Sequence, residues 1–119
     1  MSRMIAIALM TALGATAASA HPRLQASNPA PGATLQTPPR DIRMTFSEAL
    51  VPSFTGLELK TAGGKSIATG KAALVAGDSR KIVVPITARL AAGAYTVAWH
   101  AVSTDTHRVA GSYTFKVAR

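Results

Sequence analysis

Two histidines and an aspartate occupy positions from which they could bind one metal ion. Asp105 and His107 stand two residues apart in the segment Thr104-Asp105-Thr106-His107, and side chains at that spacing in extended backbone point the same way. His21 follows the small residues Ala18-Ser19-Ala20, a pattern that a signal peptidase accepts. Cleavage there would make His21 the amino terminus, so that its α-amine and its Nδ1 could chelate a metal together. With Asp105 and His107, three nitrogens and one oxygen are then available.

This set of donors favours Cu(II). Nitrogen and oxygen donors in a tetragonal plane suit Cu(II), which also stands at the top of the divalent affinity order. Zinc is the competing metal, since it prefers a tetrahedral arrangement. Pro22 has no amide N–H, so the backbone after His21 cannot add another nitrogen ligand. For Asp105-Thr106-His107 the alternative interpretation is an exposed loop with an Asx-type turn and no metal.

The first 20 residues are predicted to be a cleaved signal peptide. Arg3 precedes an apolar run, and polar and turn-forming residues follow the cleavage site directly, which argues against a spanning helix. Residues 21–119 then suffice for one domain. Cysteine is absent from the chain, so no disulfide can support this domain in an oxidising compartment and the fold must rest on packing alone.

The charge of the chain is strongly positive. It carries 13 Lys and Arg against 5 Asp and Glu, a net charge of +8 at pH 7, and loss of Arg3 with the signal would lower this by one, to +7. The basic residues are spread along the chain without a run or an aromatic stacking platform. This favours a solvated basic surface over a nucleic-acid footprint, so no nucleic-acid partner is predicted.

The pattern of side chains from position 21 onward predicts an all-β protein. Short alternating segments are separated by proline and glycine, and no helical period is evident. About seven short strands without an internal repeat are typical of a single Greek-key sandwich or barrel. The clearest predicted strands, each with alternating apolar residues, are 41–47, 55–60, 82–86, 94–102 and 112–118.

Several smaller features refine this prediction. Ala62-Gly63-Gly64-Lys65 is expected to form a hairpin turn, followed by a short pair of segments around Ile67 and Leu74 and a turn at Gly77-Asp78. Pro85 lies inside an alternating segment, and because proline lacks the N–H of a ladder donor we expect an edge strand or a bulge there.

Several segments in order along the chain resemble the CopC family of periplasmic copper-resistance proteins. They are His21 directly after the signal, Ser27-Asn28-Pro29-Ala30-Pro31-Gly32-Ala33, Met44-Thr45-Phe46-Ser47-Glu48, Gly93-Ala94-Tyr95-Thr96-Val97-Ala98-Trp99, and Ser103-Thr104-Asp105-Thr106-His107 leading through Gly111 to Phe115 and Val117. The resemblance covers the whole of residues 21–119. It implies a cupredoxin-like, Ig-like β-sandwich and Cu(II) ligands at His21, Asp105 and His107.

The resemblance also assigns neighbouring residues. Glu48 matches a glutamate near the copper, as an outer-shell or occasional ligand, and its alternative is a surface carboxylate at a strand end. His100 is expected to be exposed and not to bind the metal. Met44 is the only methionine after residue 20 and its alternation with Ile42 and Phe46 places it in the core, so no methionine site for Cu(I) is expected. Thr106 stands where the family commonly has glycine, which leaves the geometry of the loop open.

These observations predict a periplasmic Cu(II)-binding protein that acts as a copper carrier or buffer in resistance or homeostasis. It would be a monomer and not an enzyme, and it would hand copper to an inner-membrane transporter of the CopD kind. One alternative is a copper oxidoreductase that uses a histidine brace on a polysaccharide. The other is a metal-free β-sandwich adaptor for an anionic surface, suggested by the net charge.

Overall fold

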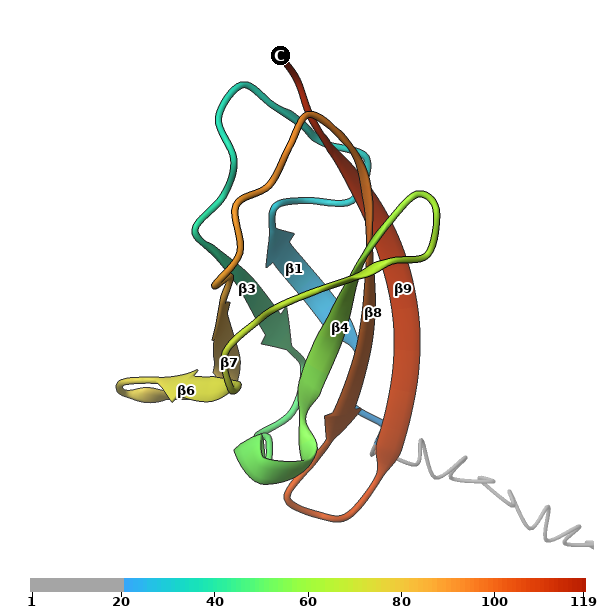
Figure 1. The fold of residues 1–119 in the computed structure, drawn as a ribbon. Helices are drawn as coiled ribbons and strands as arrows, with labels where there is room; N and C mark the ends of the chain where they lie inside the picture. The colour runs from blue at the N-terminus through green and yellow to red at the C-terminus, as the bar shows by residue number, and fades with distance from the viewer. Residues whose placement is uncertain (1–20) are drawn as a thin grey trace, which may run out of the picture.

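The structure, a computed structural model, describes residues 21–119, and the predicted signal peptide at 1–20 lies outside the described residues. These residues form two packed β-sheets (Figure 1). The sheet of four strands has the order β1 (Leu24–Asn28), β3 (Asp41–Phe46), β7 (Asp78–Pro85) and β6 (Ala73–Val75). The sheet of five strands has the order β2 (Thr34–Leu35), β9 (Arg108–Val117), β8 (Gly93–Val102), β4 (Gly56–Thr61) and β5 (Ser66–Ile67).

The predicted all-β sandwich is confirmed. All strand pairs are antiparallel except β2 with β9, and the chain crosses repeatedly from one sheet to the other. A 3₁₀ turn, η1 (Pro52–Phe54), interrupts the strands. No helix within residues 21–119 has the length and apolar character to cross a membrane. Residues 21–119 contain nine strands where about seven were expected, since two-residue strands such as β2 and β5 are too short to show alternation.

The alternating positions of the long strands face one shared core. Ile42, Met44 and Phe46 of β3 are at most 1% exposed, as the alternation predicted. The core is completed by inward residues of the other strands and of two connections: Leu50, Leu59, Ile82, Val84, Leu90, Tyr95, Val97, Ala101, Tyr113, Phe115 and Val117. Full burial of one such large apolar side chain contributes about 1.5–3 kcal/mol, so this layer holds the two sheets together.

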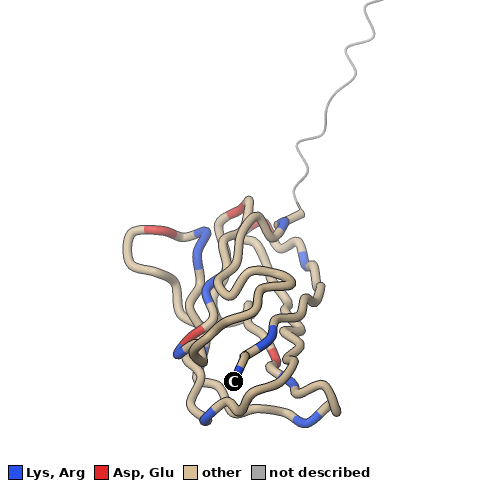
Figure 2. Tube along the Cα trace, turned by 90° about the horizontal axis from the view of Figure 1, so that it is seen from above, with Lys and Arg blue, Asp and Glu red and all other residues tan. Residues whose placement is uncertain are grey.

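Charged side chains lie outside this core. Figure 2 shows the Lys and Arg positions spread around the trace, in agreement with the absence of a basic run in the sequence. Asp41, Glu58 and Asp78 each lie within 4 Å of a Lys or Arg nitrogen, on Arg43, Lys60 and Lys81 respectively. These pairs are exposed, and such pairs contribute little to stability.

The expected hairpin at residues 62–65 is confirmed. The amide of Thr61 donates to the Lys65 carbonyl at 2.9 Å, and Gly64 has a φ of +86°, which glycine adopts without steric cost. The expected pair around Ile67 and Leu74 is wrong. Ile67 pairs with β4 and Leu74 pairs with β7, so the two belong to different sheets. The segment between them crosses from one sheet to the other.

The expectation of an edge strand or a bulge at Pro85 is also wrong. Strand β7 lies between β3 and β6, but Pro85 is its last residue and lies beyond the outermost β6 pair, Ala73 with Val83. Its missing N–H therefore breaks no ladder bond. Its carbonyl accepts a 2.8 Å hydrogen bond from the amide of Gly70.

Strand β9 starts four residues earlier than the sequence predicted, at Arg108 instead of position 112. Its first part contains Ala110 and Gly111, which give no alternation of large apolar residues. Gly111 pairs with Trp99 across the ladder. A Cβ at Gly111 would lie 2.5 Å from Cζ2 of Trp99, and the Trp99 ring packs edge-on against Phe46 with centroids 5.4 Å apart. Glycine at this position thus makes room for the indole.

We expect Gly111→Ala to lower the free energy of unfolding by about 1–3 kcal/mol, because the added methyl must displace the Trp99 ring. Urea unfolding followed by the fluorescence of Trp99, the single tryptophan, measures this. Gly63→Ala is the matched control, because its added Cβ meets only Thr61 Oγ1, at 3.9 Å, and should change stability by less than about 0.5 kcal/mol. Equal effects of the two substitutions would contradict the packing argument.

Candidate metal centre

The hairpin that joins β8 to β9 carries two of the three predicted ligands, Asp105 and His107. The ladder ends with the pair Val102 and Arg108, and the five residues between them form a closed loop. The amide of Ser103 donates to the His107 carbonyl at 3.0 Å, and the amide of Thr106 donates to the Ser103 carbonyl at 2.8 Å. Asp105 and His107 are therefore fixed on a short turn at one end of the sandwich.

Backbone hydrogen bonds bring the N-terminal segment to the same end. The amides of Arg23 and Ser47 donate to the Ser47 hydroxyl and the Arg23 carbonyl at 2.8 and 2.9 Å. The amide of Thr104 donates to the Ala49 carbonyl at 2.9 Å. The segment 47–49 thus lies between the N-terminal segment and the hairpin, and Figure 1 shows the start of the described chain beside the β8–β9 hairpin.

The predicted ligands are neighbours in space. The rings of His21 and His107 have centroids 5.1 Å apart and are nearly perpendicular, at 88°. Asp105 Oδ1 lies 3.3 Å from His107 Nδ1. That nitrogen is buried and has no hydrogen-bond partner among the described residues, although the His107 side chain as a whole is 41% exposed. An imidazole nitrogen in this state has a free lone pair for a metal when the other nitrogen carries the proton.

The three side chains do not yet surround a common point. Within residues 21–119 no group of three or more His, Asp or Glu side chains has an arrangement that would hold a metal ion. His21 and Asp105 each lie close to His107, but the three do not form such a group. In addition, the nitrogen of His21 is an amide in the full chain, since Ala20 precedes it.

Ser103 is the residue that the sequence analysis missed. It is 1% exposed, its hydroxyl donates a short hydrogen bond to Asp105 Oδ1, and it accepts from the His107 amide at 3.3 Å. The hydroxyl of Ser103 is the largest cause of a lowered pKa of Asp105, with His107 adding to the effect against some desolvation. A serine two residues before a carboxylate is the local signal that could have indicated this contact.

Thr106 takes an unusual backbone conformation between the two predicted ligands. Its φ is +73°, and it is the one non-glycine residue in positions 21–119 with a positive φ. A β-branched residue is rare there, and such a conformation costs on the order of 1–3 kcal/mol. Glycine, which the CopC family commonly has at this position, would adopt the conformation without this cost. Threonine at position 106 therefore strains the loop. The hydrogen bonds of Ser103 hold the turn in this shape.

The remaining residues named from the sequence lie as follows. Glu48 is half-buried on the segment 47–49, beside both ligand-bearing segments, and its side chain forms no ion pair or hydrogen bond with another described residue. His100 is exposed, as predicted, on the outer face of β8. Met44 is 1% exposed in the core, also as predicted, so it is not available to a metal at the surface.

The fold and this cluster define a small β-sandwich protein with two histidines and an aspartate gathered at one end. The family model described as the CopC domain matches residues 24–118, and the chain belongs to the CopC family. Copper resistance protein C of Pseudomonas syringae pv. tomato is 40% identical over 105 residues, which are 84% of this chain and 82% of that protein. The family resemblance seen in the sequence is thereby confirmed.

Two further comparisons extend this result. The crystal structure of PcoC, a methionine-rich copper resistance protein from Escherichia coli, superposes with a TM-score of 0.74 at 37% identity. The match covers 82% of this chain and 99% of that one. Copper transport protein CutJ of Bacillus subtilis is 24% identical over 100 residues, which are 84% of this chain but 18% of that protein. A domain of this kind therefore matches a small part of a much longer copper transport protein.

We expect Ser103→Ala to raise the pKa of Asp105, because the carboxylate loses the hydroxyl that favours its charged form. A lowered pKa in the folded state stabilises the fold above the ordinary pKa of aspartate, and this contribution is lost as the pH falls through the lowered value. Ser103→Ala should therefore unfold at a higher pH on acidification. Carboxyl chemical shifts in an NMR titration measure the pKa directly. Thr104→Ala, an exposed neighbour, is the control, and an unchanged pKa in Ser103→Ala would contradict the role of the hydroxyl.

Proposed function

We propose that the protein is a periplasmic carrier or buffer for Cu(II), and that His21, Asp105 and His107 bind the ion after the signal is removed. The observation that carries this proposal is the 5.1 Å approach of the His21 and His107 rings beside Asp105. Residues from opposite ends of the described chain meet there without packing into the core. Copper is the cargo of the protein, and its relatives named for copper resistance support this choice.

Binding requires a modest rearrangement of the side chains. His21 and Asp105 are both exposed, so their side chains can rotate toward a common ion while the backbone of the loop stays fixed by Ser103. Cleavage after Ala20 would free the α-amine of His21 and add the fourth donor. His107 Nδ1, which lies 3.3 Å from Asp105 Oδ1, is the nitrogen best placed to complete the set. Glu48, on the adjoining segment, is a candidate outer ligand.

The oxidation state is proposed from the donors present. Cu(I) selects soft thioether and thiolate ligands. Cysteine is absent and Met44 is buried, whereas PcoC is titled methionine-rich. Nitrogen and carboxylate donors suit Cu(II). The Asp105 carboxylate would also occupy a position that an oxygen-activating copper enzyme needs open, so we propose a carrier and not an oxidoreductase.

The partner is proposed to be an inner-membrane copper transporter of the CopD kind. The match of this domain to 18% of CutJ, a protein named for copper transport, supports a working relation between this domain and a transporter. In CutJ the matching domain is part of the transport protein's own chain. Here a separate monomer would receive copper from the transporter or give it up to the transporter in the periplasm.

The first test compares His107, in the loop between β8 and β9, with His100 on β8. His107→Ala should weaken Cu(II) binding by more than about 100-fold, since loss of an outer-shell partner alone typically costs 10–100-fold, whereas His100→Ala should leave it unchanged. Competition with a Cu(II) chelator gives the affinity, and electron paramagnetic resonance gives the number of nitrogen donors. Equal losses in the two variants, or a signal of aquated copper in the wild type, would rule out the proposed site.

The second test concerns the amino terminus. Protein that begins at His21 should bind Cu(II) much more tightly than protein with one glycine added before His21, because the added residue turns the chelating amine into an amide. Affinity should also fall as the pH is lowered, since the amine and the imidazoles must lose protons before they can bind the metal. If the extended protein binds copper with the same affinity and the same spectrum, His21 is not a ligand.

A further inference from the structure

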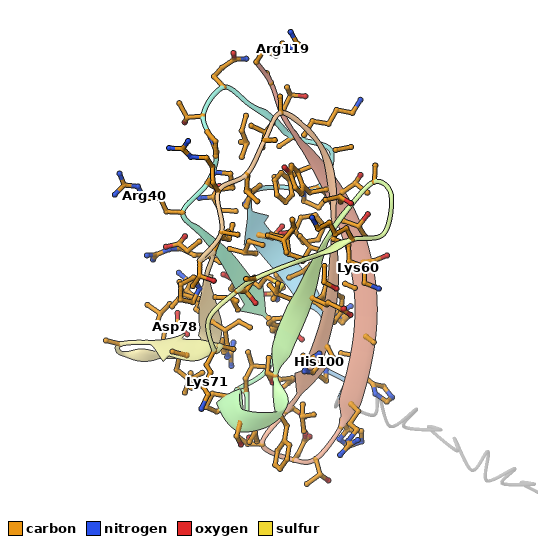
Figure 3. The ribbon with its side chains drawn as sticks, viewed as in Figure 1. Arg40, Lys60, Lys71, Asp78, His100 and Arg119 are labelled. Carbon is orange, nitrogen blue, oxygen red and sulfur yellow. The ribbon has the colours of Figure 1, made fainter. Side chains whose placement is uncertain are left out.

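The surface of the protein is hollowed on both sides of His100, an exposed residue of β8. One hollow, of about 430 Å³, lies toward β9 and is bordered by Phe54 and Arg108. The other, of about 390 Å³, lies between the start of β4 and the segment 70–72, reaches Val84 of β7, and is bordered by Gly56 and Lys71. Both share Ser53 and His100, so they form one surface, which we call the His100 groove. Figure 3 shows His100 and Lys71 on the two sides of the start of β4.

Small residues on the neighbouring strands create this groove. The ladder partners of His100 are Gly56 on β4 and Ala110 on β9. A Cβ at Gly56 would lie 3.4 Å from the imidazole carbon Cε1, so the ring lies closely over the glycine. Because Gly56 and Ala110 are small, space remains beside the imidazole of His100 that larger side chains at these two positions would fill.

The groove combines exposed apolar area with uncompensated positive charge. Phe54 is 58% exposed, more than the other large apolar side chain exposed in residues 21–119, Leu74 at 36%. Lys71 and Arg108 form no ion pair with a described residue, and no Asp or Glu borders either hollow. An anionic ligand would thus meet two free cations and no opposing carboxylate.

The groove also adjoins the candidate metal centre. Arg108 and Val102 border the hollow on the β9 side, and the same two residues form the last pair of the ladder before the loop that carries Asp105 and His107. A protein seated in the groove would therefore cover or approach the metal loop. A partner that exchanges a metal ion with the loop 103–107 would need to bind at such a place.

We propose that the His100 groove binds an acidic segment of the protein that exchanges copper with this one, with an apolar side chain of that segment against Phe54 and its carboxylates near Lys71 and Arg108. This inference rests on the proposed copper function for the identity of the partner, but not for the chemistry of the segment. A second copy of this chain is disfavoured as the occupant, because two chains of strongly positive net charge, +8 before loss of Arg3 with the signal, repel one another.

Selection of peptides from a random phage-displayed library on the immobilised, exported protein tests the proposal. We expect the selected peptides to carry aspartate or glutamate around one aromatic or aliphatic residue. Binding of the best labelled peptide, measured by fluorescence anisotropy, should weaken at least about tenfold in Phe54→Ser and in Lys71→Glu. It should also weaken as the salt concentration rises from about 50 mM to about 500 mM, because the carboxylate contacts are screened.

Two variants outside the groove serve as matched controls. Leu74→Ser removes the other exposed large apolar side chain and Arg89→Glu reverses an exposed charge, and both should bind the peptide as the wild type does. Selected peptides without acidic residues, or equal losses in Leu74→Ser, would overturn the proposal. The proposal would also be overturned if no acidic peptide bound and Phe54→Ser instead abolished binding to phosphatidylglycerol vesicles or self-association of the protein.

Copper titration of the same variants keeps the two proposals apart. Phe54 and Lys71 are not among the proposed ligands of the metal, so Phe54→Ser and Lys71→Glu should keep the Cu(II) affinity of the wild type. If the wild type binds the acidic peptide but no copper, the groove is supported and the copper function fails. If it binds copper but no acidic peptide, the groove proposal fails alone.

Discussion

Ten consecutive residue pairs join β8 to β9, and both the core and the candidate metal centre depend on this ladder. Its inward residues, among them Val97 and Phe115 with 0% exposure, lie opposite β3 and β7 of the other sheet. Its outward residues include His100. A slip by one residue would exchange these two faces and would also lengthen or shorten the loop 103–107. The burial of the core thus fixes the register, and the register fixes the positions of Asp105 and His107.

Alternation of large apolar residues was sufficient to predict the long strands and their inward faces. It failed where the side chains are small or the strands short. The first part of β9 contains Ala110 and Gly111 and has no apolar period, and β2 and β5 have two residues each. Pro85 was misplaced because its effect depends on where β6 ends, and the sequence of β7 alone does not contain that information.

In the candidate site, too, some features follow from residues close together in the sequence and others from contacts between distant segments. The spacing of Asp105 and His107 is local, so it could be recognised from the sequence. The approach of His21 to His107 depends on the bonds among Arg23, Ser47 and the hairpin, which no local pattern encodes, and the family resemblance supplied that expectation. Ser103 was missed because its burial follows from the closing of the loop 103–107 and not from an apolar period, although a serine two residues before a carboxylate is a local signal of such a contact. Its hydroxyl and backbone hold Thr106 in a strained conformation, so the loop keeps its shape without a glycine.

The attachment of the N-terminal segment has a further consequence for ligand binding. The backbone of Arg23 is held by two hydrogen bonds to Ser47, one to its hydroxyl and one from its amide. Only Pro22, which is buried, separates Arg23 from His21. A tether of one fixed residue confines the His21 imidazole to a few ångströms around His107, which corresponds to a high effective concentration. Most of the entropy of bringing the two rings together is lost during folding, not during binding. An ion that bridges them therefore meets a partly assembled chelate, and its affinity depends on the integrity of the β1–β3 edge as well as on the donors themselves.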